Sequence, residues 1–357
     1  MSLNVLFTGY APVHYTCFRP VHHALGRIEG VNVHFSGGVR SRNSAGEWEF
    51  DGPGLFGPFG IEPEAVLTIE EIQERDFDVL FCANTKAIKP RSARKTIEIF
   101  HGVSFRNLAV RAENAGKDAY FVVGPYMRRA MEHHGMLPAG DPRAVEVGFP
   151  KTDRLLDGSL DPTAILAAEG LSGERPVLVY APTGAVANSL ETMGEDVLRA
   201  LKAAGSFDVL IKLHDHPKNQ IDWRGRLAPL EDEHLRVART PDVVECLLVA
   251  DLLISDASSV ANEFAHLDRP MIFLDVPELI EVARTRPESA LDLETWGRRA
   301  GDVVAGPDAV VRAVDEALAK PERHSDIRRA MATDLFYNPG RATGAAVSWL
   351  VEEFELA

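Results

Sequence analysis

Two adjacent serines at the start of a short predicted helix form the clearest candidate phosphate site in this sequence. Ser258 and Ser259 follow the apolar run Ala250–Ile254, and a helix is predicted directly after them over Val260–Leu267. The free N–H groups and positive end of a helix favour a phosphate, and the two hydroxyls add donors. Glu263 lies one helical turn after Ser259, where a carboxylate can accept hydrogen bonds from ribose or polyol hydroxyls. The alternative is that the serines only cap the helix and Glu263 is exposed.

Three histidines follow apolar runs and are the candidates for proton transfer. His101 comes directly after Lys95–Phe100, and His214 and His216 follow Asp208–Leu213. An imidazole, with an ordinary pKa of about 6.5, can take the proton of an acceptor hydroxyl near neutral pH. His214 or His216 can hydrogen-bond phosphoryl oxygens or act as an acid toward a leaving group. A structural histidine at a strand end is the alternative reading.

The segment that contains His214 and His216 also has the composition of a metal site. His214, Asp215 and His216 are adjacent, and imidazole and carboxylate are good metal ligands. Because no third ligand is evident nearby, we predict no metal. The serine hydroxyls, a helix dipole, Arg106 and Lys212 can supply positive charge instead. Lys212 also fits a solvated lysine at the end of a strand.

Other polar residues near strand ends have weaker interpretations. Thr183 and the backbone around Gly184 are placed to meet a phosphate or a base. His14, in a predicted loop after the first strand, is read as a surface histidine. Lys151 and Asp153 are read as structural residues at a domain joint.

Apolar runs that alternate with helical segments must position these residues. The predicted strands are Asn4–Gly9, Val31–Phe35, Phe77–Cys82, Lys95–Phe100 and Ala119–Val123 in the first half, and Pro176–Tyr180, Asp208–Leu213, Ala250–Ile254 and Met271–Leu274 in the second. The predicted helices include Phe18–Leu25, Tyr126–His134, Glu191–Ala204 and Pro307–Lys320, and Ser36–Gly60 reads as a long loop or hairpin. This pattern predicts an α/β fold of two doubly wound, Rossmann-like domains that face a cleft.

Composition narrows the class of protein. The chain of 357 residues has 45% hydrophobic and 25% charged residues, as ordinary globular proteins do. A net charge of −15 argues against nucleic-acid binding. The three cysteines (Cys17, Cys82 and Cys246) are far apart and fit reduced core residues. We expect a cytoplasmic protein, since no signal peptide opens the chain and no run reaches the ~18–20 apolar residues of a membrane span.

Five motifs in one order resemble the CDP-glycerol glycerophosphotransferase family, the teichoic-acid-type polymerases and primases. They are HGVSFR at 101–106, GFPKTD at 148–153, VYAPT at 179–183, IKLHDHP at 211–217 and ISDASSVANEFAHLDRP at 254–270. The resemblance covers roughly residues 95–350 and is carried by the order and spacing of the motifs. It implies the glycosyltransferase-B fold, with an acceptor-side domain over 1–157 and a nucleotide-donor-binding domain over 158–335. A C-terminal helix over 336–357 can return to the first domain.

The resemblance also implies roles for single residues. The family's HG histidine corresponds to His101, expected near the acceptor hydroxyl, and the basic residue after it to Arg106. The second-domain histidine corresponds to His214, with His216 a close competitor. The paired serines correspond to Ser258 and Ser259, which are expected at the donor diphosphate. Arg106 and Thr183 are expected to bind the diphosphate with them. The acidic residue corresponds to Glu263, where Asp is more usual in the family.

The sequence departs from the family pattern at three points. Val103-Ser104 stands where Thr-Pro is usual after HG, and Gly184-Ala185 replaces aromatic or basic residues after APT. The amphipathic membrane-anchoring region of the teichoic-acid enzymes has no evident counterpart.

The resemblance implies a transferase that moves glycerol phosphate, or a related polyol phosphate, from a CDP-activated donor to a hydroxyl acceptor in cell-surface polymer synthesis. The acceptor is expected to be lipid-linked or a polymer chain, with peripheral contact at the inner membrane face allowed and no cofactor required. The alternatives are another glycosyltransferase-B enzyme that uses a UDP-sugar, either a glycosyltransferase or a 2-epimerase, and a non-catalytic nucleotide-binding protein.

Overall fold

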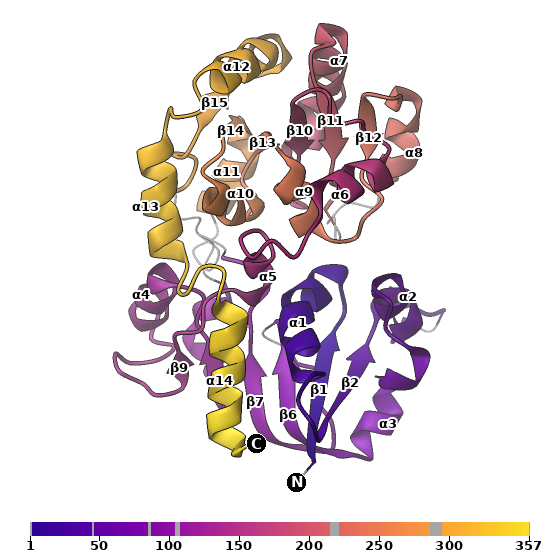
Figure 1. Ribbon diagram of the computed structural model, residues 1–357, viewed down its shortest axis with the longest axis vertical. Helices are drawn as coiled ribbons and strands as arrows, with labels where there is room; N and C mark the ends of the chain where they lie inside the picture. The colour runs from indigo at the N-terminus through magenta and orange to yellow at the C-terminus, as the bar shows by residue number, and fades with distance from the viewer. Residues whose placement is uncertain are drawn as a thin grey trace. The chain divides into compact units, whose positions relative to one another are not determined.

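The computed structural model describes residues 2–44, 46–84, 87–103, 108–214, 221–285 and 295–356 (Figure 1). The chain folds into two compact units. The first comprises Met1–His101, Ala109–Arg154 and Asp334–Ala357, and the second comprises Gly102–Leu108 and Leu155–Thr333. Each unit has a parallel sheet flanked by helices, so the predicted fold class of two doubly wound, Rossmann-like domains is confirmed.

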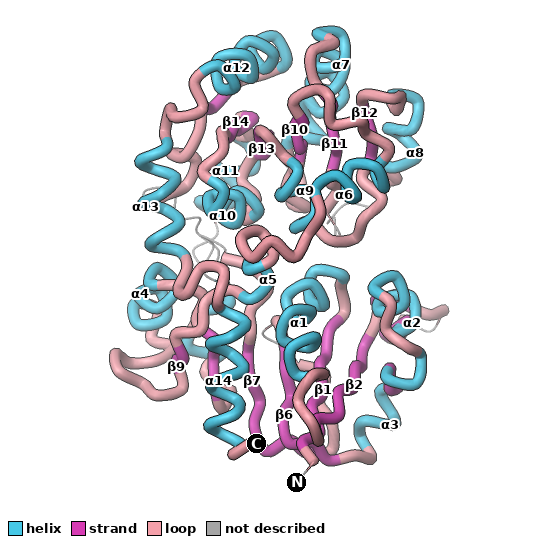
Figure 2. The backbone as a smooth tube through the Cα atoms, viewed as in Figure 1, coloured by secondary structure: helices cyan, strands magenta, loops and turns pink. Residues whose placement is uncertain are grey.

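The sheet of the first unit has the order β5-β2-β1-β6-β7-β8-β9 with every pair parallel (Figure 2). Its strands are β1 (Leu3–Gly9), β2 (Val31–Gly37), β5 (Val66–Leu67), β6 (Asp76–Cys82), β7 (Ser92–Glu98), β8 (Ala119–Phe121) and β9 (Ala144–Val145). Phe7 of β1 is in register with Phe35 and Phe81, and its ring stacks on theirs at 5.7 and 4.8 Å. Burying each such ring contributes about 1.5–3 kcal/mol, which explains why these apolar runs are central strands.

Helices on both faces complete the first unit (Figure 1). They are α1 (Pro12–Leu25), α2 (Gly52–Phe56), α3 (Ile69–Gln73), α4 (Pro125–His133), α5 (Pro150–Asp153) and α14 (Ala342–Phe354), with 3₁₀ turns at Gly57–Phe59, Pro63–Ala65, Leu108–Val110 and Ala112–Asn114. The buried carboxylate of Asp153 accepts hydrogen bonds from the N–H groups of Ala342 and Thr343 at 3.0 and 2.6 Å. Asp153 thus satisfies the first turn of α14 and fixes where this helix docks.

The sheet of the second unit has the order β12-β11-β10-β13-β14-β15, again with all pairs parallel. Its strands are β10 (Val177–Tyr180), β11 (Asp208–Ile211), β12 (Leu235–Val237), β13 (Leu252–Ser255), β14 (Met271–Leu274) and β15 (Asp302–Val304). In both sheets the first three strands follow one another from the middle of the sheet to one side. The fourth strand then pairs with the free side of the first strand, and the remaining strands extend the sheet in the opposite direction. Ligands of open α/β sheets bind at this switch point, beyond the carboxyl ends of the strands. In the second unit it lies between β10 and β13.

The second unit contains the remaining helices, which surround this sheet (Figure 1). They are α6 (Pro162–Glu169), a π-helical turn (Leu190–Gly194) that continues into α7 (Glu195–Ala204), α8 (Trp223–Leu227), α9 (Val243–Val249), α10 (Val260–Phe264), α11 (Pro277–Arg284), α12 (Pro307–Ala319) and α13 (Ser325–Leu335), with 3₁₀ turns at Ala228–Leu230 and Ala265–Leu267. A core of buried Leu, Ile and Val side chains fills the space between the sheet, α7 and α12.

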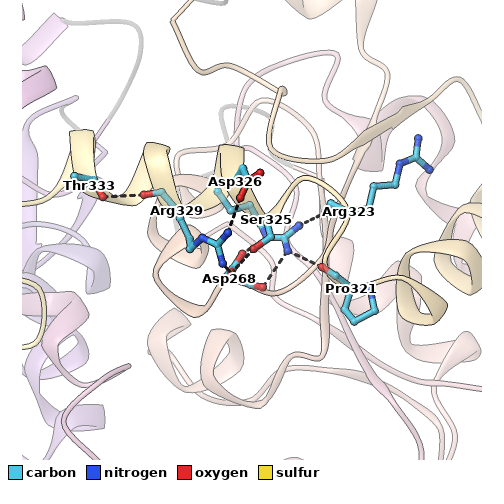
Figure 3. A network of polar contacts seen from close by, with 8 residues as sticks. Asp268, Pro321, Arg323, Ser325, Asp326, Arg329 and Thr333 are labelled. Carbon is cyan, nitrogen blue, oxygen red and sulfur yellow. Dashed lines mark hydrogen bonds and ion pairs between the residues drawn. The ribbon is translucent and has the colours of Figure 1, made fainter.

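A buried arginine holds α13 on the turn before β14. Arg328 is 1% exposed, and its guanidinium donates to a carboxylate oxygen and the carbonyl of Asp268 at 2.9 and 3.1 Å. It also donates to the carbonyls of Pro321 and Arg323 at 2.6 and 2.7 Å. Figure 3 shows Asp268 meeting Ser325, which donates its hydroxyl at 2.6 Å. All three guanidinium nitrogens therefore donate hydrogen bonds, and these bonds join the turn at Asp268 to the segment that precedes α13.

Some predicted elements differ from those observed. Helix α1 begins at Pro12, not at Phe18, because a proline preset for helical φ starts the helix. The strand predicted over Lys95–Phe100 corresponds to β7, which begins three residues earlier than predicted, at Ser92, and ends two residues earlier, at Glu98. Phe100 takes a left-handed conformation with φ of 57°, which ends the extended chain.

The region predicted as a loop or hairpin contains the antiparallel pair β3 (Val39–Arg42) and β4 (Trp48–Asp51), followed by α2. The three cysteines are buried, as predicted, and form no disulfide with one another. Among the described residues, no helix has the length and apolar character needed to cross a membrane.

Candidate functional site

A buried aspartate organises the loops at the switch point of the second unit. Asp256 is fully buried and follows β13. One of its oxygens accepts from the N–H groups of Thr183 and Ala257 at 2.9 and 2.6 Å. The other accepts from the N–H and the hydroxyl of Ser189 at 3.0 and 2.8 Å. Asp256 therefore ties the loop after β10 to the serine turn after β13.

The two serines lie immediately beyond this aspartate. Ser258 and Ser259 are half-buried, and the hydroxyl of Ser258 accepts weakly from the N–H of Val260 at 3.4 Å. Ser259 occupies the N-cap position of α10, but its hydroxyl makes no capping hydrogen bond within the described part of the chain. The reading in which both serines only cap a helix does not describe Ser259. Thr183 shares this edge of the sheet with both.

Helix α10 also holds the segment that follows His101. Asn262, 2% exposed, donates its side-chain amide to the carbonyl of Val103 at 2.6 Å. A Cβ atom on Gly102 would lie 3.3 Å from the Ser259 hydroxyl, so glycine permits this close approach. These contacts place Gly102 and Val103 with the second unit. Sequence reasoning did not single out Asn262.

Glu263 is 2% exposed and is one of the buried residues of α10. The alternative in which this carboxylate is an exposed surface group is therefore wrong. A ribose or polyol contact by Glu263 stays a prediction.

His214 lies over the glycine that follows Thr183. A Cβ atom on Gly184 would lie only 2.6 Å from Nδ1 of the His214 ring, while the ring itself is exposed to solvent. The loops after β10 and β11 thus meet through this imidazole. Lys212, predicted as solvated, is 8% exposed and donates to the carbonyl of Leu213 at 3.2 Å.

Two predicted site residues, Arg106 and His216, lie outside the described residues. Among the residues that are described, no group of three or more His, Cys, Asp or Glu side chains comes together as a metal site. The His-Asp-His segment lies mostly outside this search, since Asp215 is also not described.

The other candidate base, His101, belongs to the first unit and follows β7. Its Nδ1 makes a short hydrogen bond to the carbonyl of Ala83. Because a carbonyl only accepts, Nδ1 carries the proton and Nε2 of the neutral ring keeps its lone pair. The left-handed Phe100 before it costs on the order of 1–3 kcal/mol, a strain often found at functional sites. This geometry presents His101 as a proton acceptor through Nε2.

The electrostatic surroundings favour the neutral form of His101. His101 is exposed as a residue, yet the protein around its ring lowers the pKa of the imidazole below 6.5, chiefly because partial removal from water disfavours the imidazolium. The cation of Lys151 lowers the pKa further, and the bond to Ala83 opposes both. Lys151, predicted as a structural residue at a domain joint, is buried, and its charge also acts on this histidine.

A second histidine stands beside His101. His14 lies in α1 and is 3% exposed, so the predicted surface-loop position is wrong. Its ring centroid is 5.3 Å from that of His101, and its Nδ1 accepts from the N–H of Tyr10 at 3.1 Å. Pro12, the residue that starts α1, was the sequence signal that could have placed His14 in a helix.

Comparison with known proteins identifies the family. The family model described as CDP-Glycerol:Poly(glycerophosphate) glycerophosphotransferase matches residues 81–348, which is most of the chain. The chain belongs to this family. The resemblance inferred from the five motifs is therefore confirmed, and the match begins in β6 and includes the switch-point edge of the second unit.

Curated relatives of this glycerophosphotransferase family member match over a limited region. A teichoic acid poly(glycerol phosphate) polymerase of Bacillus subtilis (strain 168) is 29% identical over 144 residues, which is 38% of this chain and 19% of the relative. A teichoic acid glycerol-phosphate primase of Bacillus spizizenii (strain ATCC 23059 / NRRL B-14472 / W23) is 31% identical over 130 residues, 35% of this chain and 32% of the relative.

Solved structures show how widely the fold is shared. The wall teichoic acid polymerase TagF matches with a TM-score of 0.69 at 15% identity, over 99% of this chain and 89% of that chain. A UDP-N-acetylglucosamine 2-epimerase matches with a TM-score of 0.59 at 12% identity, over 99% and 96% of the two chains. At these identities the likeness concerns the fold, which glycerophosphotransferases and epimerases have in common.

Proposed function

We propose that the protein transfers glycerol phosphate, or a related polyol phosphate, from a CDP-activated donor to a hydroxyl acceptor. The observation that carries the proposal is the hydrogen bond between His101 Nδ1 and the Ala83 carbonyl, which leaves Nε2 as the basic nitrogen. The family supplies the donor class, since it is described by CDP-glycerol and poly(glycerophosphate). The relatives named as polymerase and primase support a role in cell-surface polymer synthesis.

In the proposed reaction His101 Nε2 takes the acceptor hydroxyl proton as the oxygen attacks the β-phosphorus of the donor. The bond from this phosphorus to the bridging oxygen breaks, and CMP leaves with the electron pair. The product is a phosphodiester between acceptor and glycerol.

The switch-point residues of the second unit are proposed to hold the donor. Ser258, Ser259 and Thr183 bind the diphosphate together with Arg106, and Glu263 binds the ribose or polyol hydroxyls. Hydroxyl and guanidinium donors aimed at the departing phosphate stabilise the charge that develops on it. We propose no metal or other cofactor.

A histidine of the second unit completes the proposed chemistry. His214, with His216 the other candidate, hydrogen-bonds the phosphoryl oxygens or protonates the leaving group. The acceptor is proposed to be lipid-linked or a polymer chain, met at the inner face of the membrane by a cytoplasmic protein.

The test of the proposal is donor choice and turnover. Purified protein should be stabilised against thermal unfolding by CDP-glycerol and CDP, and should release CMP when a hydroxyl acceptor is added. Stabilisation by UDP or UDP-N-acetylglucosamine but not by CDP ligands would refute the proposal and favour an epimerase or glycosyltransferase. Binding of CDP-glycerol without turnover would favour a non-catalytic binding protein.

Gly184→Ala should lower CMP release by roughly 10–100-fold, because the new methyl group forces the His214 ring out of position. The fold should survive, since that ring is exposed and can move away. Gly344→Ala in α14 is the matched control, because a Cβ there meets nothing within 4 Å. Initial rates and melting temperatures of both variants check the prediction; equal rates would argue against a role for His214.

The pH dependence should report the lowered pKa of His101. The neutral imidazole is the active form, so kcat/KM should rise with pH through a pKa below 6.5 and level off before neutrality. Lys151→Met removes a nearby cation, makes the imidazolium less unfavourable and should move this acid limb to higher pH. A limb centred above 6.5 in the wild type, or one unmoved in the variant, would contradict this account.

A further inference from the structure

One face of the β3–β4 hairpin gathers arginine and aromatic side chains. Arg42 pairs directly with Trp48 and Arg40 with Phe50 across the antiparallel ladder. Directly opposite residues lie on the same face of such a pair, so these four side chains share one face. The other face carries the acidic residues of the hairpin, at positions 49 and 51. The hairpin therefore separates its charges onto two faces.

The arginines of this face stack on rings, and within the part of the chain that the structure describes neither forms an ion pair with a carboxylate. The guanidinium carbon of Arg42 lies 4.6 Å from the centre of the Trp48 ring. That of Arg40 lies 5.1 Å from Trp48 and 3.7 Å from Tyr10. Over the described ranges, Nε of Arg40 is buried without a hydrogen-bond partner, and the single hydrogen bond of Arg42 goes to the carbonyl of Gly46 at 3.3 Å.

In a chain of net charge −15, two arginines that form no ion pair with any described residue need another explanation. Two acids of the hairpin segment bind other groups: Asp51 accepts from the N–H of Gly54 at 2.8 Å, and Glu47 accepts from the Asn43 amide at 3.3 Å. Trp48 nevertheless keeps 52% of its surface exposed. An exposed indole beside uncompensated guanidinium groups is a surface suited to an anionic ligand with an apolar part.

This face is connected to His101 by a continuous series of side chains. Tyr10, stacked on Arg40, packs its ring at 4.5 Å from that of His14. His14 in turn lies 5.3 Å from His101. The segments involved follow β1, β2 and β7, whose carboxyl ends share one edge of the parallel sheet of the first unit. The series runs from Trp48 to the proposed base within this unit.

We propose that the face formed by Arg40, Arg42 and Trp48 is the site at which an acceptor chain carrying phosphodiester groups binds. This inference rests on the proposed function and extends it to the acceptor. The guanidinium groups bind successive phosphates through paired N–H donors, and the indole packs on the carbon atoms between them. Bound in this way, the terminal hydroxyl of the chain is directed along Tyr10 and His14 toward His101.

An anionic membrane surface is the competing occupant of this face. It is disfavoured because an extended anionic surface would also meet the acidic residues at positions 49 and 51 of the same hairpin, whereas a single chain can contact the basic face alone. The series of side chains that ends at His101 also has no role in membrane binding. A soluble phosphodiester chain meets both observations.

Binding of a synthetic oligo(glycerol phosphate), measured by titration calorimetry without donor, tests the inference directly. The double variant Arg40→Gln/Arg42→Gln should raise its Kd by at least ~10-fold, since charge-assisted bonds are lost. Binding should also weaken with salt. Arg75→Gln is the matched control: Arg75 precedes β6 at the opposite edge of the same sheet, is 48% exposed, and should leave Kd unchanged. Arg42→Gln alone should give an intermediate Kd. Because Arg42 is exposed, this single variant keeps the fold and tests the inference even if the double variant misfolds.

Kinetics separate this inference from the proposed function. With CDP-glycerol as donor, the double variant should raise KM for the oligomer and leave KM for the donor unchanged. If the wild type turns over no CDP-glycerol, the proposed function fails, while the calorimetric Kd still decides the acceptor site. Equal Kd for wild type and double variant overturns the inference. The inference is also overturned if the double variant loses binding to phosphatidylglycerol vesicles but binds the oligomer as the wild type does.

Discussion

His101→Asn should lower CMP release at saturating CDP-glycerol by roughly 10²–10⁴-fold, the usual contribution of a general base. Asparagine keeps an N–H donor for the Ala83 carbonyl but has no basic nitrogen in place of Nε2. The fold should therefore remain while proton transfer is lost. Rapid quench or a continuous assay of CMP, together with the melting temperature, measures both effects.

The control for this variant is His133→Asn, which changes an exposed histidine of α4 in the same unit. It should turn over CDP-glycerol at the wild-type rate. Full activity of His101→Asn would remove the base from the mechanism. Donor binding by calorimetry should be the same for both variants, because His101 is assigned to the acceptor.

The largest expected effect on stability comes from Arg328→Met. Breaking a buried ion pair typically costs about 3–5 kcal/mol, because the remaining charge and carbonyls lose their partner. Arg328 is 1% exposed, but Asp268 keeps partial access to solvent, so we expect the lower end of this range. Differential scanning calorimetry should show a lower melting transition for the second unit.

Arg329→Met provides a closely matched comparison. Arg329 is the next residue of α13, and its guanidinium lies 3.6 Å from the same carboxylate, but its side chain is 63% exposed. Figure 3 shows Arg329 beside Asp268. Exposed ion pairs contribute at most ~1 kcal/mol, so this variant should unfold close to the wild type. Similar losses in the two variants would show that burial of Arg328 is not the source of its effect.

The sequence predicted the strands well because each central strand is buried on both faces and reads as a short apolar run. Val179 and Ile254 illustrate this, since both are fully buried in adjacent strands of the second sheet. The ends of strands were less predictable. The left-handed turn at Phe100 depends on tertiary packing and has no local signal, since Phe is not a residue that favours positive φ.

The candidate site was predicted only in part, for a similar reason. The serines, histidines and Glu263 were identified by residue type and motif, but Asp256 and Asn262 act through bonds to residues far away in the sequence. Asp256 reaches Ser189, 67 positions earlier, and Asn262 reaches Val103, 159 positions earlier. The burial of Glu263 was missed because one carboxylate on a short helix gives no periodicity from which its face can be read.

The course of the chain has a practical consequence for dissection of the protein. The backbone passes from one unit to the other four times, after residues 101, 108, 154 and 333. A fragment of residues 155–333 would contain the second sheet but lack the 102–108 segment. The amide of Asn262 would then lose the Val103 carbonyl beside the paired serines. Neither half can be isolated intact by one proteolytic cut, so excised fragments are poor substitutes for the full-length polypeptide in binding assays.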